Sequence, residues 1–293
     1  MKKTYRNNSQ LALDIMRGQW LLHNPGQYVR MARSFLEKRG LDVTVSEKTD
    51  AEKAEYRTVC GDIFSMDAVD PSLPEQQQLI LVIPMHGVLT KYDNCIGCAT
   101  MEIVDIIEDT LKDRKVCGYV LDIDSPGGAV NAIAPLVAAI KKVQAEGIPI
   151  ICHVDQCGSA AYWIATQTDA IFTDNMMSSV GSVGAYMSIV DDRENKQTGE
   201  RIIDIYAPES KDKNRAYREA LDGDCKLAEQ QLSETVALFT KAVKEGRKDL
   251  KADADGVLTG AMFMTPQAVE LGMVDGMNDL QGCIENVYVR ASI

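Results

Sequence analysis

Two stretches of this sequence place small and polar residues where a reactive group would be expected. In the first, Cys157-Gly158-Ser159 follows an apolar run, residues 149–154, that predicts a buried strand. It opens an apolar segment, residues 159–168, that predicts a buried helix. The first turn of a helix has unpaired backbone N–H groups and a positive dipole, which favour Ser159 either as a nucleophile or as an ordinary helix cap. This stretch alone leaves both interpretations open.

The second stretch is Asp-Ser-Pro-Gly-Gly at residues 124–128, between a predicted strand at 116–123 and a predicted helix at 130–146. Proline fixes one dihedral angle and the glycines allow a tight fold with bare N–H groups. Such a corner can hold an anion or an oxyanion, and it can also be a plain turn. It is neither a phosphate-binding P-loop nor a dinucleotide fingerprint, because the Gly-Lys-Ser/Thr sequence and the GxGxxG spacing are missing.

The two corners should lie close together, because successive parallel strands are usually neighbours and ligand sites lie at their carboxyl ends. A hydroxyl with several backbone donors is what acyl transfer requires. The serine also needs a base. No histidine follows Ser159, so a histidine base would have to be His86 or His153, and a structural role is the alternative for His86. A lysine can act as the base only when it is uncharged, which requires burial to lower its pKa. The candidate is Lys211, which lies in a polar loop after a predicted strand at 201–206; the alternative is that its side chain is simply solvated.

The elements that would position these residues alternate along the chain. Residues 1–40 are predicted to be helical, and residues 41–78 are polar with little strand pattern. From residue 79 the pattern predicts an α/β fold with a mostly parallel β-sheet and flanking helices. We therefore divide the chain into an N-terminal arm, 1–78, and a main domain, 79–293. Further strands are predicted at 79–85, 170–173 and 183–190, and further helices at 101–112, 225–248 and 265–271, the last followed by a short polar helix.

Composition excludes several classes of protein. The chain has 43 acidic and 31 basic residues and a net charge of −12, which disfavours nucleic acid as a partner. It lacks an apolar run of the ~20 residues that a membrane span needs, and no signal-peptide pattern follows the first lysines, so we expect a cytoplasmic protein. The CxxC at residues 95–98 has no second pair at zinc-binding spacing, so we expect no metal and no cofactor.

Six short motifs appear together in a recognisable order between about residues 79 and 275. They resemble the signal peptide peptidase A (protease IV) family of serine peptidases, especially its phage head-maturation (prohead) branch. The resemblance implies the Clp protease/crotonase-like fold. The motifs are DSPGG at 124–128, GSAAYWIA at 158–165, VGSVG at 180–184, SKD at 210–212, GVLTG at 256–260 and AVELGMVD at 268–275.

The resemblance assigns a role to each site residue. It implies Ser159 as the nucleophile, Lys211 as the general base and Ser182 as the serine that orients the lysine ammonium. The backbone N–H groups of Gly128 and Ala160 match the oxyanion hole. A Ser-Lys dyad would explain why no histidine follows the serine. The chain has Ala-Ala after the serine where the family often has Gly-Gly, and Pro208 where a glycine commonly precedes the lysine motif, so Lys213 is the alternative base.

The function implied by the resemblance is a serine endopeptidase that cleaves phage capsid or scaffold proteins. It also implies a homo-oligomeric ring, in which the lysine of some relatives comes from a neighbouring subunit, and activity that rises with pH as the lysine loses its proton. Two alternatives are a crotonase-like acyl-CoA enzyme on the same fold and a catalytically silent assembly protein. Three roles remain open for residues 1–78: they dock on a capsid component, block the site until they are processed, or cap the ring.

Overall fold

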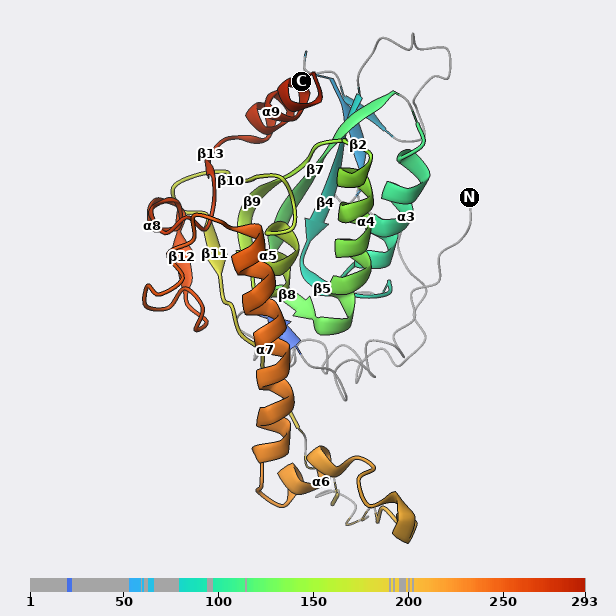
Figure 1. The fold of residues 1–293 in the computed structure, drawn as a ribbon. Helices are drawn as coiled ribbons and strands as arrows, with labels where there is room; N and C mark the ends of the chain where they lie inside the picture. Colours follow the sequence, from blue (N-terminus) through green and yellow to red (C-terminus); the bar gives the residue numbers. More distant parts are fainter. Residues whose placement is uncertain are drawn as a thin grey trace.

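A sheet of mostly parallel strands runs through the molecule, as Figure 1 shows. The computed structural model describes residues 20–22, 53–58, 60, 63–65, 79–93, 97–113, 115–189, 191, 193–194, 199, 201 and 203–292. The sheet order is β12-β11-β9-β7-β4-β2-β3, with β12 formed by Met262–Met264, and the pairs from β4 to β11 are all parallel. This confirms the predicted α/β class with a mostly parallel sheet. The parallel strands are β4 (Leu79–His86), β7 (Val116–Ser125), β9 (Ile150–Gly158), β10 (Ile171–Thr173) and β11 (Ser179–Gly181).

Alternate residues of the central strands face different helices, because side chains of a strand point to opposite faces in turn. Leu81 belongs to the core beneath α3, α4 and α5, whereas Ile80 and Val82 pack with α9 on the other face. Both sets are apolar, as expected for a parallel sheet covered on two sides. The helices are α3 (Thr100–Thr110), α4 (Ile133–Ala145, after the 3₁₀ turn η3, Val130–Ala132), α5 (Ala160–Ala165), α8 (Thr265–Glu270) and α9 (Leu280–Ala291).

A second, smaller sheet lies at the carboxyl ends of β4 and β7. Its order is β1-β8-β5-β6. Strand β5 follows β4 almost directly and β8 follows β7, so the two turns that end the main strands feed this sheet. Its strands are β1 (Trp20–Leu22), β8 (Gly127–Ala129), β5 (Val88–Thr90) and β6 (Gly97–Ala99).

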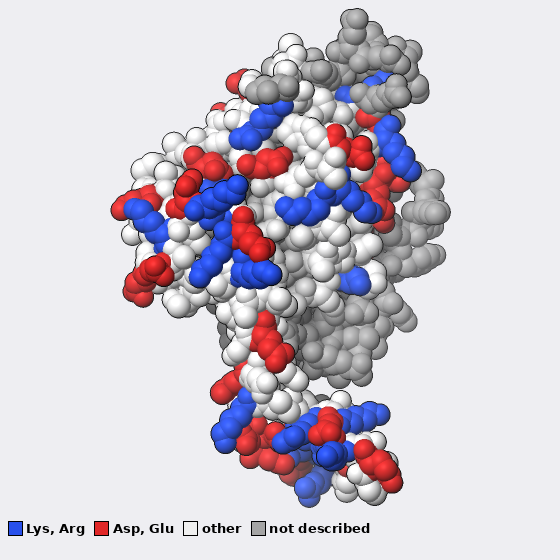
Figure 2. Space-filling view, viewed as in Figure 1, with Lys and Arg blue, Asp and Glu red and all other residues white. Residues whose placement is uncertain are grey.

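The long helix α7 (Lys226–Gly246) connects the body to a projecting segment. Phe239 and Val243, near its C-terminal end, are buried in the core, but only Ala228 is buried in its first half. Residues 203–225, which we call the projecting segment, include η4 (Pro208–Ser210) and α6 (Arg215–Leu221) and lie beyond the N-terminal end of α7 (Figure 1). Acidic and basic side chains crowd on this segment (Figure 2). No helix in the described part of the chain combines the length and the apolar character that crossing a bilayer requires.

Two predicted strands are wrong. Residues 183–189 contain no strand, and a short strand, β11, forms just before them instead. Residues 203–207 are not a strand either, and Ile203 and Ile205 are 74% and 91% exposed. Alternating apolar residues form a strand only where another strand supplies hydrogen bonds, and at 203–207 the described chain supplies none.

The predicted N-terminal arm is described only in part. Most of the predicted helical region, residues 1–40, lies outside the described residues, but Trp20–Leu22 is a strand, not a helix. Strands β2 (Glu55–Arg57) and β3 (Ile63–Ser65) pair onto β4 and extend the main sheet. The described pieces of the arm are therefore hydrogen-bonded to the sheets of the predicted main domain, and the boundary at residue 78 stays a prediction. At the other end, the C-terminal segment after α8 forms β13 (Gly276–Met277) and α9.

Candidate active site

Ser159 lies at the sharp turn between β9 and α5, in an unusual backbone conformation. Its dihedral angles are φ 54° and ψ −113°, in the left-handed half of backbone space that a non-glycine residue adopts at a cost of about 1–3 kcal/mol. The turn is held on both sides: the Ser159 N–H donates to the carbonyl oxygen of Gly181 at 2.7 Å, and the Trp163 N–H donates to the carbonyl oxygen of Ser159 at 2.9 Å. Such strain persists only where the surrounding structure imposes it, and it is common at functional sites.

The side chain of Ser159 does not cap the helix it precedes. It makes no hydrogen bond to the N–H groups of the first turn of α5. Its hydroxyl instead donates, at a long 3.4 Å, to the carbonyl oxygen of Gly184, and the residue is 1% exposed. The ordinary helix-cap interpretation therefore fails, since a cap requires the serine oxygen to accept from those N–H groups. The chain holds a strained serine whose hydroxyl has only a weak partner.

Strand β11 brings Ser182 close to this turn. Gly181 pairs with Gly158 in the parallel register of β11 and β9, so Ser182 is the next residue after that pair, as Ser159 is on its own strand. Ser182 also has a positive φ, 55°, and its N–H donates to the carbonyl oxygen of Ala261 at 2.7 Å. A Cβ on Gly181 would lie 2.4 Å from that same carbonyl oxygen, so only glycine fits before Ser182. The two sequence-predicted serines thus lie on adjacent strand ends.

The elements that carry the two predicted oxyanion-hole residues contact each other. Gly128 lies in β8 and Ala160 opens α5, both residues are buried, and the two elements contact each other. A Cβ on Gly128 would lie 2.0 Å from the carbonyl oxygen of Leu89, so glycine at this position allows β5 and β8 to approach closely.

A further positioning residue, Ser125, is not identified by the sequence patterns. Its buried hydroxyl donates to the carbonyl oxygen of Gly87 at 2.6 Å and accepts from the N–H of Gly127 at 3.1 Å. It therefore ties the end of β4 to the turn that leads into β8. The only sequence signal for this role is its place in the DSPGG motif, and its partner Gly87 is 38 residues away.

Helix α5 is fixed to the body by its own side chains. The hydroxyl of Tyr162 is buried and donates to the carbonyl oxygen of Met273 at 2.9 Å. The ring of Trp163 stacks on Phe239 of α7, with centroids 4.8 Å apart and planes within 10° of parallel. Because α5 is short, these contacts rather than helix propensity hold the turn at Ser159 in place.

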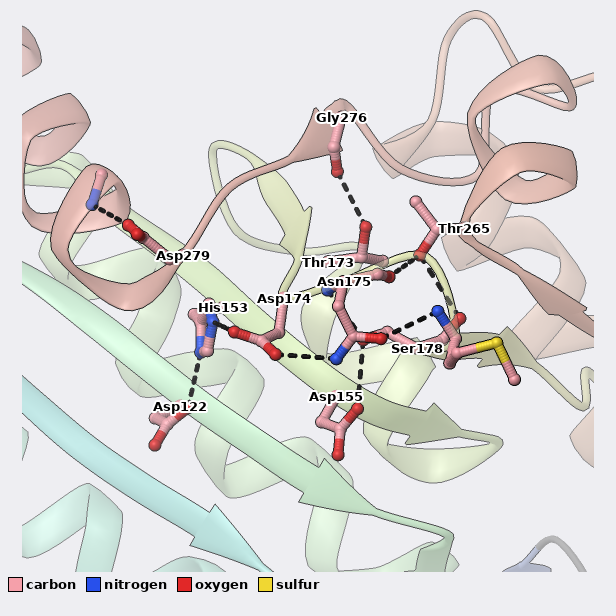
Figure 3. Close-up of polar contacts among 12 residues, drawn as sticks. Asp122, His153, Asp155, Thr173, Asp174, Asn175, Ser178, Thr265, Gly276 and Asp279 are labelled. Carbon is pink, nitrogen blue, oxygen red and sulfur yellow. Dashed lines mark hydrogen bonds and ion pairs between the residues drawn. The ribbon is translucent and has the colours of Figure 1, made fainter.

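His153 is not available to Ser159 as a base. It lies on the face of β9 that also carries Ile151, and Ile151 packs with α9. Its Nδ1 lies 2.8 Å from a carboxylate oxygen of Asp122 and its Nε2 lies 3.1 Å from one of Asp174, as Figure 3 shows. His86 lies 3.4 Å from the other oxygen of Asp122, so both histidines that precede Ser159 in the main domain are paired with carboxylates. We call these four residues the His153 cluster.

Charge and burial compete in this cluster. Burial alone would lower the pKa of His153, but the hydrogen bonds and charges of Asp122 and Asp174 outweigh it and raise that pKa above its usual value. Burial alone would raise the pKa of Asp122, but hydrogen bonds from His153 and His86 hold it well below its usual value. In the described residues, no group of acidic, histidine and cysteine side chains has the geometry to hold a metal ion, so the cluster is best described as an ion-pair network.

This network predicts a specific pH dependence of stability. A histidine whose pKa is raised in the folded state stabilises the protein. This stabilisation is complete below the histidine pKa of the unfolded chain, about 6.5, and is lost as pH rises through the pKa of the folded state. An aspartate whose pKa is lowered in the folded state stabilises the protein above the aspartate pKa of the unfolded chain, about 3.9. This stabilisation is lost as pH falls through the pKa of the folded state. We expect His153→Gln to cost about 2 kcal/mol at pH 6 and less at pH 9, measured by thermal unfolding. His86→Gln, at a more exposed site, is the control, and parallel pH curves for wild type and His153→Gln would contradict the assignment.

Lys211 lies on the projecting segment, at the end of η4, and is exposed. Its carbonyl oxygen accepts a hydrogen bond from Arg218, whose guanidinium lies 4.6 Å above the ring of Tyr206. Helix α5 packs against the C-terminal half of α7, whereas η4 lies beyond its N-terminal end (Figure 1). A helix of this length spans about 30 Å. Within one chain the structure therefore does not bring Lys211, or the equally exposed Lys213, to Ser159, and both remain predictions as the base.

A serine in a strained turn after a parallel strand, beside a glycine-rich backbone corner, defines the class: an α/β protein with a mostly parallel sheet and a candidate site at the strand ends. The family comparison gives a more specific assignment. The model of peptidase family S49 matches residues 142–292, just over half of the chain, and the chain belongs to this family. The matched region includes Ser159, Ser182 and Lys211 but not the corner at Gly128.

Individual relatives are distant. Protease 4 of Salmonella typhi is 24% identical over 189 residues, which cover 64% of this chain and 30% of that protein. The head-tail preconnector protein GP5 of Enterobacteria phage P21 is 26% identical over 202 residues, covering 66% of this chain and 36% of GP5. The chain spans between about a third and three-fifths of the length of the curated relatives it matches.

Two of the solved structures that the chain resembles show how low the structural similarity is. The membrane-bound stomatin-specific protease 1510-N matches with a TM-score of 0.36 and 19% identity, over 70% of this chain and 82% of that one. An enoyl-CoA hydratase/isomerase family member matches with a TM-score of 0.43 and 14% identity, over 73% of both chains. Neither likeness bears on the activity of this chain.

Proposed function

We propose that this protein is a serine endopeptidase in which Ser159 is the nucleophile. Its membership of peptidase family S49 supports this reaction class. The observation that carries the proposal is the Ser159 turn itself: a strained serine whose hydroxyl neither caps its helix nor has a close hydrogen-bond partner. Backbone strain of this kind has to be offset elsewhere in the fold, and it is common at functional sites.

In the proposed reaction, the Ser159 hydroxyl attacks the carbonyl carbon of a peptide bond while an uncharged lysine, Lys211, takes its proton. The carbonyl oxygen becomes an oxyanion that accepts hydrogen bonds from the N–H groups of Gly128 and Ala160. The lysine then gives the proton to the departing amine, and water releases the acyl group from Ser159 by the same steps. Ser182 is the residue we assign to orient the lysine amine.

The distance of Lys211 from Ser159 within one chain leads us to propose that the dyad forms between two copies of the protein. Several apolar side chains of α7 and of the projecting segment are uncovered: Leu238 of α7 is 62% exposed, and Ile203 and Ile205 are more exposed still. A shallow groove along α7 is lined by Ala185, Leu232 and Val236. Docking of a second copy would cover these surfaces and carry its lysine toward the serine of its neighbour.

The likeness to the phage protein GP5 supports phage head proteins, capsid or scaffold, as the proposed substrates. The proposed location of this reaction is the cytoplasm of a bacterial host, within an assembling capsid. No described residue specifically favours a thioester substrate over a peptide.

A fluorophosphonate probe tests the proposal directly. We expect covalent labelling of the purified protein at Ser159, located by peptide mass spectrometry, because only an activated serine attacks this reagent readily. Ser159→Ala should lose the label, and Ser182→Ala should keep the site but label more slowly. An unlabelled Ser159 in a protein whose melting temperature rises with an acyl-CoA ester would instead support the crotonase-like alternative.

A further inference from the structure

A segment of the chain's own N-terminal region is paired with the strand that carries the predicted oxyanion donor. Strand β1 runs antiparallel to β8, with Trp20 opposite Ala129, Leu21 opposite Gly128 and Leu22 opposite Gly127. Helix α5, which Ser159 precedes, also contacts β1. Residues far apart in the sequence thus place a short extended peptide beside the candidate active site (Figure 1).

Strand β8 can bind a peptide at only one of its two edges. Its other edge is taken by β5, through the parallel pair of Leu89 and Gly128. The remaining edge is the one that β1 occupies. An unpaired strand edge presents a row of backbone N–H and C=O groups that accept any extended peptide. Strand β8 consists of two glycines and an alanine, so its side chains contribute little to the choice between peptide sequences. Recognition of a peptide at this edge therefore depends mainly on backbone hydrogen bonds.

The proposed reaction needs an extended peptide in the same place. If the Gly128 N–H stabilises the oxyanion, the scissile carbonyl must lie against β8, and the flanking substrate residues must run along its free edge. Leu21 is directly opposite Gly128, so residues 20–22 and a substrate cannot occupy this edge together. The segment belongs to the same chain, so its effective concentration at the edge exceeds that of a free peptide with the same sequence.

We propose that Trp20–Leu22 is a built-in inhibitory strand that occupies the substrate edge of β8 and keeps Ser159 from substrate until it is displaced. The inference rests on the proposed function, since it needs an active serine at this site. The same edge is then a peptide-binding site, and its first occupant is the chain itself. Release of the segment, by an incoming substrate or by processing of the N-terminal region, would activate the enzyme.

The test is a proline scan of the segment in the full-length chain. Successive N–H groups of a strand point to opposite edges, so either Leu21→Pro or Leu22→Pro removes one that points at β8. We expect the effective variant to raise the rate of fluorophosphonate labelling at Ser159 about tenfold, as when a site that is open a tenth of the time becomes fully open. Leu21→Ala and Leu22→Ala keep their backbone N–H groups, so they are the matched controls and should label at the wild-type rate.

A second measurement does not depend on catalysis. In a Ser159→Ala background, hydrogen exchange at the amides of β8 should be slow in the parent, fast in the effective proline variant and slow in the two alanine variants. A synthetic peptide of residues 15–27, carrying a fluorophore, should bind the proline variant more tightly than the parent. Absence of labelling in every variant would reject the proposed function, while exchange and peptide binding would still decide whether residues 20–22 occupy this edge.

Two results would overturn the inference. One is unchanged exchange at β8 in both proline variants, which would mean that β1 does not protect this edge. The other is faster exchange with no gain in labelling in a protein that labels normally at Ser159, which would mean that the strand is paired there but does not block the site.

Discussion

Ser159→Ala is expected to lower peptidase activity by at least about a thousandfold, because loss of the nucleophile removes the covalent route and leaves only binding and the oxyanion hole. The backbone conformation at residue 159 separates this loss from a folding defect. Alanine retains the strained φ of 54°, so Ser159→Ala should unfold at nearly the wild-type temperature. Glycine adopts that conformation freely, so Ser159→Gly should be equally inactive yet more stable than Ser159→Ala by about 1 kcal/mol.

Two measurements on the wild type, Ser159→Ala and Ser159→Gly check this prediction. One is cleavage of an unstructured protein substrate, and the other is the temperature of thermal unfolding. An inactive and more stable Ser159→Gly variant would show that the fold gives up stability to hold a reactive serine. Substantial activity in Ser159→Ala would remove Ser159 from the mechanism. Equal stability of the glycine and alanine variants would mean that the turn carries no strain.

Lys211→Ala is also expected to abolish activity, and a mixture of two inactive variants should restore it. If the dyad forms between copies, Ser159→Ala chains supply intact lysines and Lys211→Ala chains supply intact serines. After unfolding and joint refolding in equal amounts, about a quarter of the sites in a symmetric oligomer would combine both. We therefore expect roughly that fraction of wild-type activity from the mixture, and none from either variant refolded alone.

Lys213→Ala is the matched control for this experiment, because it removes a lysine two residues away on the same exposed segment. It should retain activity, alone and in mixtures. Activity that survives in Lys211→Ala but not in Lys213→Ala would assign the base to Lys213. A mixture that stays inactive although both single variants fold and assemble would place serine and lysine in the same chain, which would require the projecting segment to move.

Much of the site's framework can be predicted from local patterns. The apolar runs that become β4, β7 and β9 are continuous because both faces of a parallel sheet are buried, and the helical spacing of α3 and α4 follows from a single apolar face. These patterns place Ser159 and Gly128 at neighbouring strand ends. Patterns failed at residues 183–189 and 203–207, where apolar residues are present but no partner strand is available in the described chain.

By itself, the sequence determined the class of fold, the order of its main elements, the serine between β9 and α5, and the motifs of family S49. Only the tertiary structure decided that Ser159 is strained and does not cap its helix, because that depends on the carbonyl of Gly181 in a neighbouring strand. It also decided that His153 is held by Asp122 and Asp174, that Leu21 pairs with Gly128, and that the segment of η4 and α6, in which Lys211 lies, projects away from the body. Each of these depends on contacts between residues distant in the chain, and local spacing carries no information about them because folding alone brings such residues together.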